Sequence, residues 1–301
     1  MEKVILNFNK KPSDALTLLQ AFKSRNSRFN PDQTIPEIHS IRSEFRINPT
    51  HIKSFTAICG IEPTRHLHIL YPFTLVYPYL MRILCRKEMP FSQFKILNTR
   101  NQIIMFRPIR PDEKLQIDCY NSTARIIPKG LECDFKAEIY AGTEKVWENT
   151  VTYFVPGKFG DSAPSYTQHR LEPIANPSIT KEWFLEAKNR FKFGRVSGDT
   201  NGIHYSSFYA RMLGFKRDIA QPIRIIAACV SNLPEQAADV PAELDFFLKG
   251  PVYYENMLTL KNQKTGHADR FDLYCAGNEK PCVIGRLINI NERRHSDEIA
   301  C

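Results

Sequence analysis

The chain has 301 residues, enough for two domains, and its 43% hydrophobic content provides material for buried cores and excludes an intrinsically disordered protein. Its longest apolar stretch, residues 71–85, is shorter than the roughly 20 residues that cross a bilayer and contains Pro72, Pro78 and Arg82, so we expect no membrane span. The net charge of +9 comes from scattered residues without a basic run, which does not predict nucleic-acid binding but would attract anionic molecules such as coenzyme A.

The eight cysteines show no Cys-x-x-Cys spacing and no clustering with histidine. Such a pattern predicts buried, reduced thiols in a cytoplasmic protein, with no metal site and no cofactor. The first residues, MEKVILNFNKK, lack an apolar run before a small-residue cleavage site, so we expect no signal peptide.

Along the chain, Ser13 as an N-cap and apolar residues at helical spacing predict a short helix over residues 13–25. Residues 26–46 are polar and contain proline, which favours an arm rather than a domain. Residues 156–177 are rich in proline, glycine and serine and are typical of a connector. The charged tail after Glu292 is expected to fray.

The two halves of the chain resemble each other, and internal repeats of this kind decide the fold. Four pairs of segments match in the same order and at a nearly constant offset. These pairs are Phe55–Gly60 with Phe193–Gly198, which places His66 opposite His204; Pro78–Pro90 with Pro222–Pro234; Pro108–Leu115 with Pro251–Leu258; and Ala141–Lys145 with Ala276–Lys280. The sequence therefore predicts a tandem duplication.

Each half follows one plan, in which a short element and a loop precede an apolar helix and a run of strands. Strands around a buried helix give an α+β architecture. We expect the two buried helices at Pro78–Met89 and Pro222–Leu233. The predicted divisions are an N-terminal helix and arm (1–46), a first, degenerate repeat (47–156), a linker (157–180), a second, catalytic repeat (181–292) and a tail (293–301).

Residues 193–210, FGRVSGDTNGIHYSSFYA, carry the most specific motif. This stretch resembles the signature of the R-specific enoyl-thioester hydratases, or MaoC-like dehydratases. The matching positions are Phe193, Val196, Ser197, Gly198, Asp199, Asn201, Ile203, His204 and Ala210. Gly202 replaces the usual proline, and the resemblance extends over roughly residues 50–290. It implies a tandem (double) hot-dog fold, each half an antiparallel sheet wrapped round a central helix, with one active site between the repeats.

The resemblance also implies a reaction, the addition of water to a 2-enoyl thioester or its reversal. That chemistry needs a base, an acid and donors for the charge on the thioester oxygen. Following the family, Asp199 and His204 would bind and activate the water. Asn201 can bond backbone groups to fix the loop, and we expect Ser197 and Asn201 among the substrate-binding residues. The expected partner is an acyl-CoA or an acyl-carrier-protein thioester. The first half has Ile61 opposite Asp199, so it should serve as a structural and substrate-binding wall, and its apolar residues 71–80 suit either an acyl tunnel or ordinary core.

One departure bears on activity. Where the family continues His-Gly at the start of the central helix, this chain has Gln221-Pro222, and proline has no N–H for an oxyanion hole. The amide of Ile223 or the side chain of Gln221 would have to replace that donor. The alternative is a non-catalytic hot-dog protein that binds acyl thioesters or partners a catalytic subunit. The sequence leaves open the chain length, the carrier, the direction of reaction and whether the protein is a monomer or a homodimer.

Overall fold

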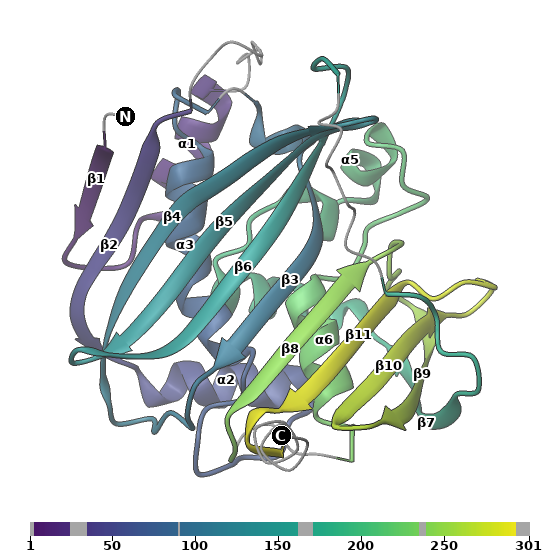
Figure 1. Ribbon diagram of the computed structural model, residues 1–301. Helices are drawn as coiled ribbons and strands as arrows, with labels where there is room; N and C mark the ends of the chain where they lie inside the picture. Colours follow the sequence, from purple (N-terminus) through teal and green to yellow (C-terminus); the bar gives the residue numbers. More distant parts are fainter. Residues whose placement is uncertain (1–2, 25–34, 90, 162–170, 235–238, 293–301) are drawn as a thin grey trace.

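A computed structural model of the protein describes residues 3–24, 35–89, 91–161, 171–234 and 239–292. Its described strands form one continuous sheet in the order β1-β2-β4-β5-β6-β3-β8-β11-β10-β9-β7. Strands β3 and β8 pair antiparallel at the middle, with Ile103 opposite Leu244, and join the two halves of the molecule (Figure 1).

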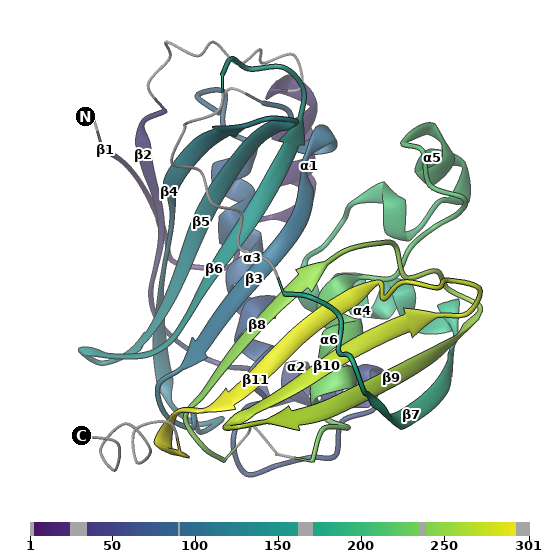
Figure 2. The same ribbon diagram turned by 45° about the vertical axis from the view of Figure 1, so that its right-hand side comes forward.

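The two halves repeat one strand order, read outward from this central pair. The first half contains β2 (Glu37–Arg46), β3 (Leu97–Met105), β4 (Lys114–Ile127), β5 (Gly130–Ala141) and β6 (Glu144–Pro156). The second contains β7 (Ser178–Leu185), β8 (Ala242–Leu248), β9 (Asn256–Thr265), β10 (Ala268–Cys275) and β11 (Val283–Asn289). Each of these five strands of the first half has its counterpart at the same place in the second, and β1 (Lys3–Phe8) adds an edge strand to the first half. The predicted duplication and the α+β hot-dog plan are therefore confirmed (Figure 2).

The match of Phe55–Gly60 with Phe193–Gly198 also holds in three dimensions. Helices α2 (Pro49–Cys59) and α4 (Arg190–Ser197) pack together, and the rings of Phe55 and Phe193 lie 6.3 Å apart. Both helices end at a glycine in the left-handed region, Gly60 with φ 67° and Gly198 with φ 74°. Glycine adopts this conformation without the steric cost that other residues meet, so the sequence match marks two equivalent helix ends.

The central helices are α3 (Tyr71–Leu84) and α6 (Pro222–Val230). The second begins at Pro222 as predicted and ends three residues before the predicted Leu233, whereas the first begins seven residues before the predicted Pro78 and ends before Met89. Pro72 occupies the first turn, where proline is well tolerated, and Pro78 lies inside the helix. The matching prolines and cysteines of these two segments are therefore not structurally equivalent. The pattern misled because proline inside a helix was taken for a helix start.

The prediction of an arm over residues 26–46 was wrong for the part that the structure describes. Residues 37–46 form β2, which pairs antiparallel with β4 and parallel with β1 (Lys3–Phe8). Ile38, His39 and Ser40 are buried, whereas Ser43, Glu44 and Arg46 are exposed. A strand near the edge of a sheet keeps one polar face, which explains a composition that looked like loop. Residues 25–34 lie outside the described part.

The predicted N-terminal helix is present as α1 (Asp14–Ser24), and Ser13 Oγ accepts a hydrogen bond from the amide of Leu16 at 3.4 Å. Helix α1 packs against α3, and the described residues of the second half contain no counterpart of it. The predicted linker 157–180 overlaps the start of β7 at Ser178, and the predicted tail 293–301 lies outside the described residues.

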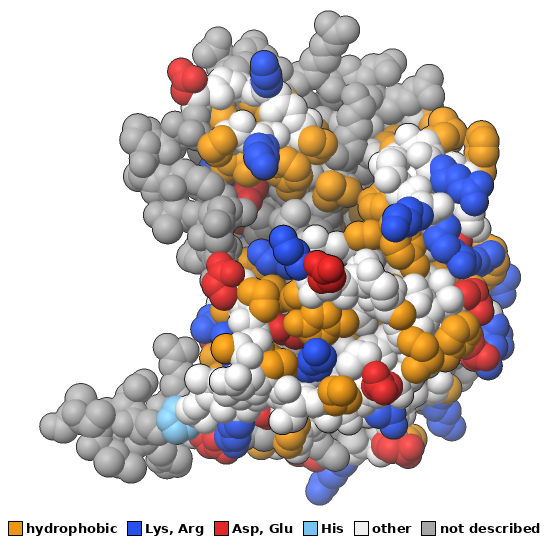
Figure 3. Space-filling view, turned by 90° about the vertical axis from the view of Figure 1, so that its right-hand side faces the viewer, with side chains coloured by type: hydrophobic (Ala, Val, Ile, Leu, Met, Phe, Trp, Pro, Cys, Tyr) orange, Lys and Arg blue, Asp and Glu red, His pale blue; other side chains and the backbone are white. Residues whose placement is uncertain are grey.

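The seven described cysteines are buried and have free thiols, as the sequence predicted. On the face shown in Figure 3, basic side chains are interspersed with acidic and hydrophobic ones. Within the described residues, no helix has the length and apolar character needed to cross a membrane.

Candidate active site

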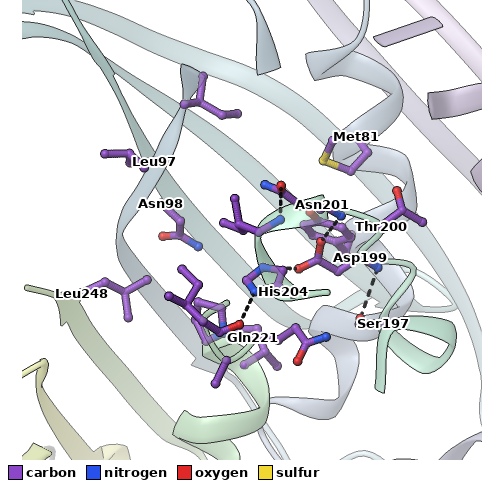
Figure 4. A pocket seen from close by; sticks show the side chains of 18 of the residues that line it. Met81, Leu97, Asn98, Ser197, Asp199, Thr200, Asn201, His204, Gln221 and Leu248 are labelled. Atoms are coloured by element: carbon purple, nitrogen blue, oxygen red, sulfur yellow. Dashed lines mark hydrogen bonds and ion pairs between the residues drawn. The ribbon is translucent and has the colours of Figure 1, made fainter. Parts of the chain in front are cut away.

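A cavity of about 790 Å³ lies between the two repeats. Its walls come from α1, α3 and β3 on one side, and from the loop after α4 and the start of α6 on the other. The six residues predicted for the site all line it: Ser197, Asp199, Asn201, His204, Gln221 and Ile223. Figure 4 shows Asp199 and His204 side by side in this cavity, with Leu97, Asn98 and Leu248 nearby.

The loop that carries Asp199 and His204 is stabilised by hydrogen bonds from its own side chains. Ser197 Oγ accepts a hydrogen bond from the amide of Asp199 at 3.2 Å and donates to the carbonyl of Phe193 at 3.0 Å. Asn201 Oδ1 accepts from the amide of Ile203 at 3.3 Å and caps the short 3-10 helix Gly202–His204. Ser197 and Asn201 therefore fix the loop, and their expected contact with substrate stays a prediction.

Asp199 and His204 form a direct pair, with His204 Nε2 3.2 Å from Asp199 Oδ2. The other ring nitrogen, Nδ1, lies 2.9 Å from the carbonyl oxygen of Ile219. A carbonyl oxygen only accepts, so Nδ1 carries a proton, and a carboxylate facing Nε2 requires a proton there as well. The geometry thus describes an imidazolium–carboxylate pair, both members of which are buried.

The electrostatics of the site agree with this assignment. Burial alone raises the pKa of Asp199, but His204, the amide of Asn201 and the hydroxyl of Tyr77 together bring the pKa below its ordinary value. Burial likewise lowers the pKa of His204, but the charge of Asp199 and the carbonyl of Ile219 outweigh it and raise the pKa overall. Each group thus stabilises the ionised form of the other.

The first repeat contributes a hydrogen bond that the sequence motif did not reveal. Tyr77, on α3, hydrogen-bonds the carboxylate of Asp199, and burial together with that carboxylate raises the pKa of Tyr77 well above its ordinary value. The hydroxyl of Tyr205 donates to the backbone carbonyl of Asp199. Tyr77 lies within residues 71–80, the stretch considered for a tunnel, but no spacing rule linked it to Asp199.

The side chain of Gln221 is fully engaged away from the expected oxyanion position. Its Nε2 donates to the carbonyl of Arg190 at 3.1 Å and to the hydroxyl of Tyr205 at 3.2 Å. Its Oε1 accepts from the hydroxyl of Tyr254. Because a side-chain amide has two hydrogens, no donor remains for a substrate, which argues against the expected help from Gln221.

The amide of Ile223 is the remaining expected donor. Gln221 is the N-cap of α6, and Ile223 lies in the first helical turn, where backbone N–H groups have no acceptor within the helix. Ile223 also lines the cavity. Its amide therefore has no acceptor within the helix, and its use as an oxyanion donor stays a prediction.

His66, the first-repeat counterpart of His204, lies outside this cavity. Its Nδ1 is 2.6 Å from Asp239 Oδ1 near the surface. With Ile61 in place of the carboxylate, His66 has no equivalent of the Asp199 partner, and a single active site stays a prediction.

Comparison with known proteins places this geometry in context. No family model matches the chain. A 3-hydroxyacyl-thioester dehydratase X from Mycobacterium tuberculosis is 24% identical over 196 residues, which are 65% of this chain and 70% of that protein.

Solved structures show the same fold. The crystal structure of a MaoC-like dehydratase from Phytophthora capsici aligns with a TM-score of 0.72 at 16% identity, covering 87% of this chain and 98% of that one. A Mycobacterium tuberculosis protein described as a double hot-dog fold aligns with a TM-score of 0.56 at 10% identity, covering 82% and 93% of the two chains. The chain is therefore a double hot-dog protein, and its sequence resemblance to the MaoC-like dehydratases is confirmed.

Proposed function

We propose that this protein is an R-specific hydratase/dehydratase that interconverts 2-enoyl and 3-hydroxyacyl thioesters of coenzyme A or an acyl-carrier protein. The observation that carries the proposal is the buried Asp199–His204 pair, 3.2 Å apart, in the wall of a cavity of about 790 Å³ between the repeats. The relation in sequence to a 3-hydroxyacyl-thioester dehydratase supports the same reaction.

The protonation state of the pair suggests how the two groups divide the work. In the hydration direction, water adds its oxygen to C3 and gives a proton to the carboxylate of Asp199. The imidazolium of His204 delivers its Nε2 proton to C2. Asp199 then returns its proton to Nε2 across the 3.2 Å contact, which restores the starting pair and balances the reaction.

The negative charge that develops on the thioester oxygen needs a donor inside the buried site. The first-turn amide of Ile223 fits this role, since Pro222 has no N–H and Gln221 donates elsewhere. Losing one such donor typically reduces the rate by about 10²–10³. The site therefore retains the amide of Ile223 as a donor but lacks the N–H that the family pattern would offer at position 222.

The test is hydration of crotonyl-CoA by the purified protein, followed as loss of the enoyl-thioester absorbance. Asp199→Asn keeps the shape of the side chain and removes its charge, so turnover should fall by at least about 10² while the unfolding temperature stays close to that of the wild type. Near wild-type turnover in Asp199→Asn would remove Asp199 from the mechanism.

A second candidate function rests on Gln221-Pro222. With these residues unable to donate, a protein of this fold could bind acyl thioesters without converting them, alone or beside a catalytic subunit. Tight binding of a long acyl-CoA, with no hydration of any enoyl-CoA by the wild type, is the result expected of that function.

A further inference from the structure

Helix α1 forms part of the cavity wall although it belongs to neither repeat. Asp14, Thr17, Leu18 and Phe22 of this helix line the same cavity as Asp199. The helix packs on α3, so a segment that precedes the first repeat contributes to the cavity wall (Figure 2).

The beginning of α1 lies at the catalytic loop. A Cβ atom on Gly198 would be 3.4 Å from Lys11 Nζ and 3.5 Å from Asp14 Oδ1. Lys11 and Asp14 themselves form an ion pair at 3.3 Å, just before and at the first turn of the helix. One end of α1 is thereby placed beside the residue that precedes Asp199.

The other end of α1 lies away from the reacting groups. Phe22 follows Asp14 by eight helical residues, and at about 1.5 Å per residue this separates the two by roughly 12 Å along the helix axis. The ring of Phe22 packs on that of Phe94, with centroids 5.2 Å apart at an interplanar angle of 40°. The apolar residues that α1, α3 and the segment before β3 contribute to the cavity wall are Leu18, Phe22, Met81, Phe94, Ile96 and Leu97.

We infer that α1 closes the far end of the acyl site, so that Leu18 and Phe22 limit the length of the acyl chain that this protein accepts. Phe22 lines the cavity and is 51% exposed, so its ring lies where the cavity meets solvent. Removing that ring would open the end of the cavity and let a longer chain pass. This inference rests on the proposed acyl-thioester substrate.

The experiment compares Phe22→Ala and Leu18→Ala with two further variants. Leu18→Trp fills the cavity and should act in the opposite direction. Leu19→Ala is the matched control, since Leu19 is 52% exposed on the same helix and is not among the residues that line the cavity. Thermal unfolding of each variant verifies that α1 stays docked.

Two readouts separate this inference from the proposed reaction. The first is kcat/KM for trans-2-decenoyl-CoA and trans-2-hexadecenoyl-CoA, and the second is the affinity for the saturated decanoyl-CoA and palmitoyl-CoA. Each additional buried methylene strengthens binding by roughly fourfold. The preference for the longer chain should therefore rise by about tenfold or more in Phe22→Ala and Leu18→Ala, fall in Leu18→Trp and stay unchanged in Leu19→Ala.

Three possible results distinguish the chain-length role of α1 from the proposed reaction. If the affinities shift in this way but the wild type hydrates nothing, the length role of α1 stands and the proposed reaction falls. An unchanged preference in Phe22→Ala, Leu18→Ala and Leu18→Trp overturns the role of α1 while the reaction stands. Failure of the wild type to bind or hydrate any of these thioesters overturns both.

Discussion

The hydroxyl of Tyr77, on the central helix of the first repeat, hydrogen-bonds the carboxylate of Asp199, in the loop of the second repeat. The degenerate repeat thus acts directly on the group proposed as base. A half of a duplicated protein that lacks the acidic residue can instead contribute side chains that stabilise the site of the other half. A phenol hydrogen-bonded to the carboxylate stabilises its ionised form and fixes its orientation.

Tyr77→Phe should therefore weaken the site without reshaping the cavity. Burial favours the protonated acid at Asp199, and the bond from Tyr77 opposes that effect, so its loss raises the pKa of Asp199. We expect the acid limb of the kcat/KM profile to move to higher pH and the maximum to fall by about tenfold, the value of one hydrogen bond to a charged group.

Tyr79→Phe is the matched control for this measurement. Tyr79 is buried on the same helix, but its hydroxyl accepts from Arg42 Nη1 at 3.1 Å on the side away from Asp199. An acid limb that stays in place in Tyr77→Phe, or one that moves equally in both variants, contradicts the assigned role of Tyr77.

The proposed division of work also predicts the shape of the wild-type pH profile. Asp199 must be ionised, and its lowered pKa places the acid limb below the ordinary value of 3.8. His204 must be protonated, and its raised pKa places the basic limb above the ordinary value of 6.5. The profile of kcat/KM should be bell-shaped and flat between these values. A rise in activity as pH increases through 6.5 would instead indicate a neutral imidazole acting as base.

Much of this site could be predicted from the sequence because its key residues are neighbours in the chain. Asp199 and His204 lie on one short loop, and the left-handed glycine at its start leaves a recognisable pattern. The run of strands in the second repeat was expected for a similar reason, since alternating burial, as in β9 and β10, leaves a period of two in the sequence.

The contributions from distant segments could not be predicted in this way. Tyr77 reaches Asp199 only because α3 of the first repeat packs against α4 of the second, and Phe22 lines the cavity only because α1 docks on α3. Such contacts depend on tertiary packing and leave no local period. The start of α3 was misplaced for a related reason, since an internal proline is tolerated where its ring is buried, as at Pro78.

The equivalent glycines of the two repeats permit a matched stability test. Gly60→Ala and Gly198→Ala both place a side chain in the left-handed region, which costs about 1 kcal/mol. An added Cβ meets nothing within 4 Å at Gly60, but at Gly198 it would lie 2.9 Å from Pro78 Cγ. We expect Gly198→Ala to lose about 1–3 kcal/mol more than Gly60→Ala in denaturant unfolding. Equal losses of stability in the two variants would show that α3 shifts to relieve this contact.

The final prediction concerns the start of α6. The sequence suggested that Gln221→His with Pro222→Gly would restore the family pattern, but the structure separates the two positions. Gln221 is 1% exposed and bonded to Arg190, Tyr205 and Tyr254, so its replacement leaves buried partners unsatisfied at about 1–3 kcal/mol each. Pro222 makes no such bonds through its side chain and lines the cavity.

Pro222→Gly alone should therefore be the productive change. It adds an N–H in the first turn of α6, beside the amide of Ile223, at the cost of about 0.4–1 kcal/mol for the lost restriction of the unfolded chain. We expect kcat for crotonyl-CoA to rise by about tenfold or more, because the new donor strengthens as charge develops on the thioester oxygen. The double variant should unfold at a lower temperature than Pro222→Gly. An unchanged kcat in a folded Pro222→Gly protein would mean that the thioester oxygen does not face the start of α6, and that its donor must be sought on another wall of the cavity.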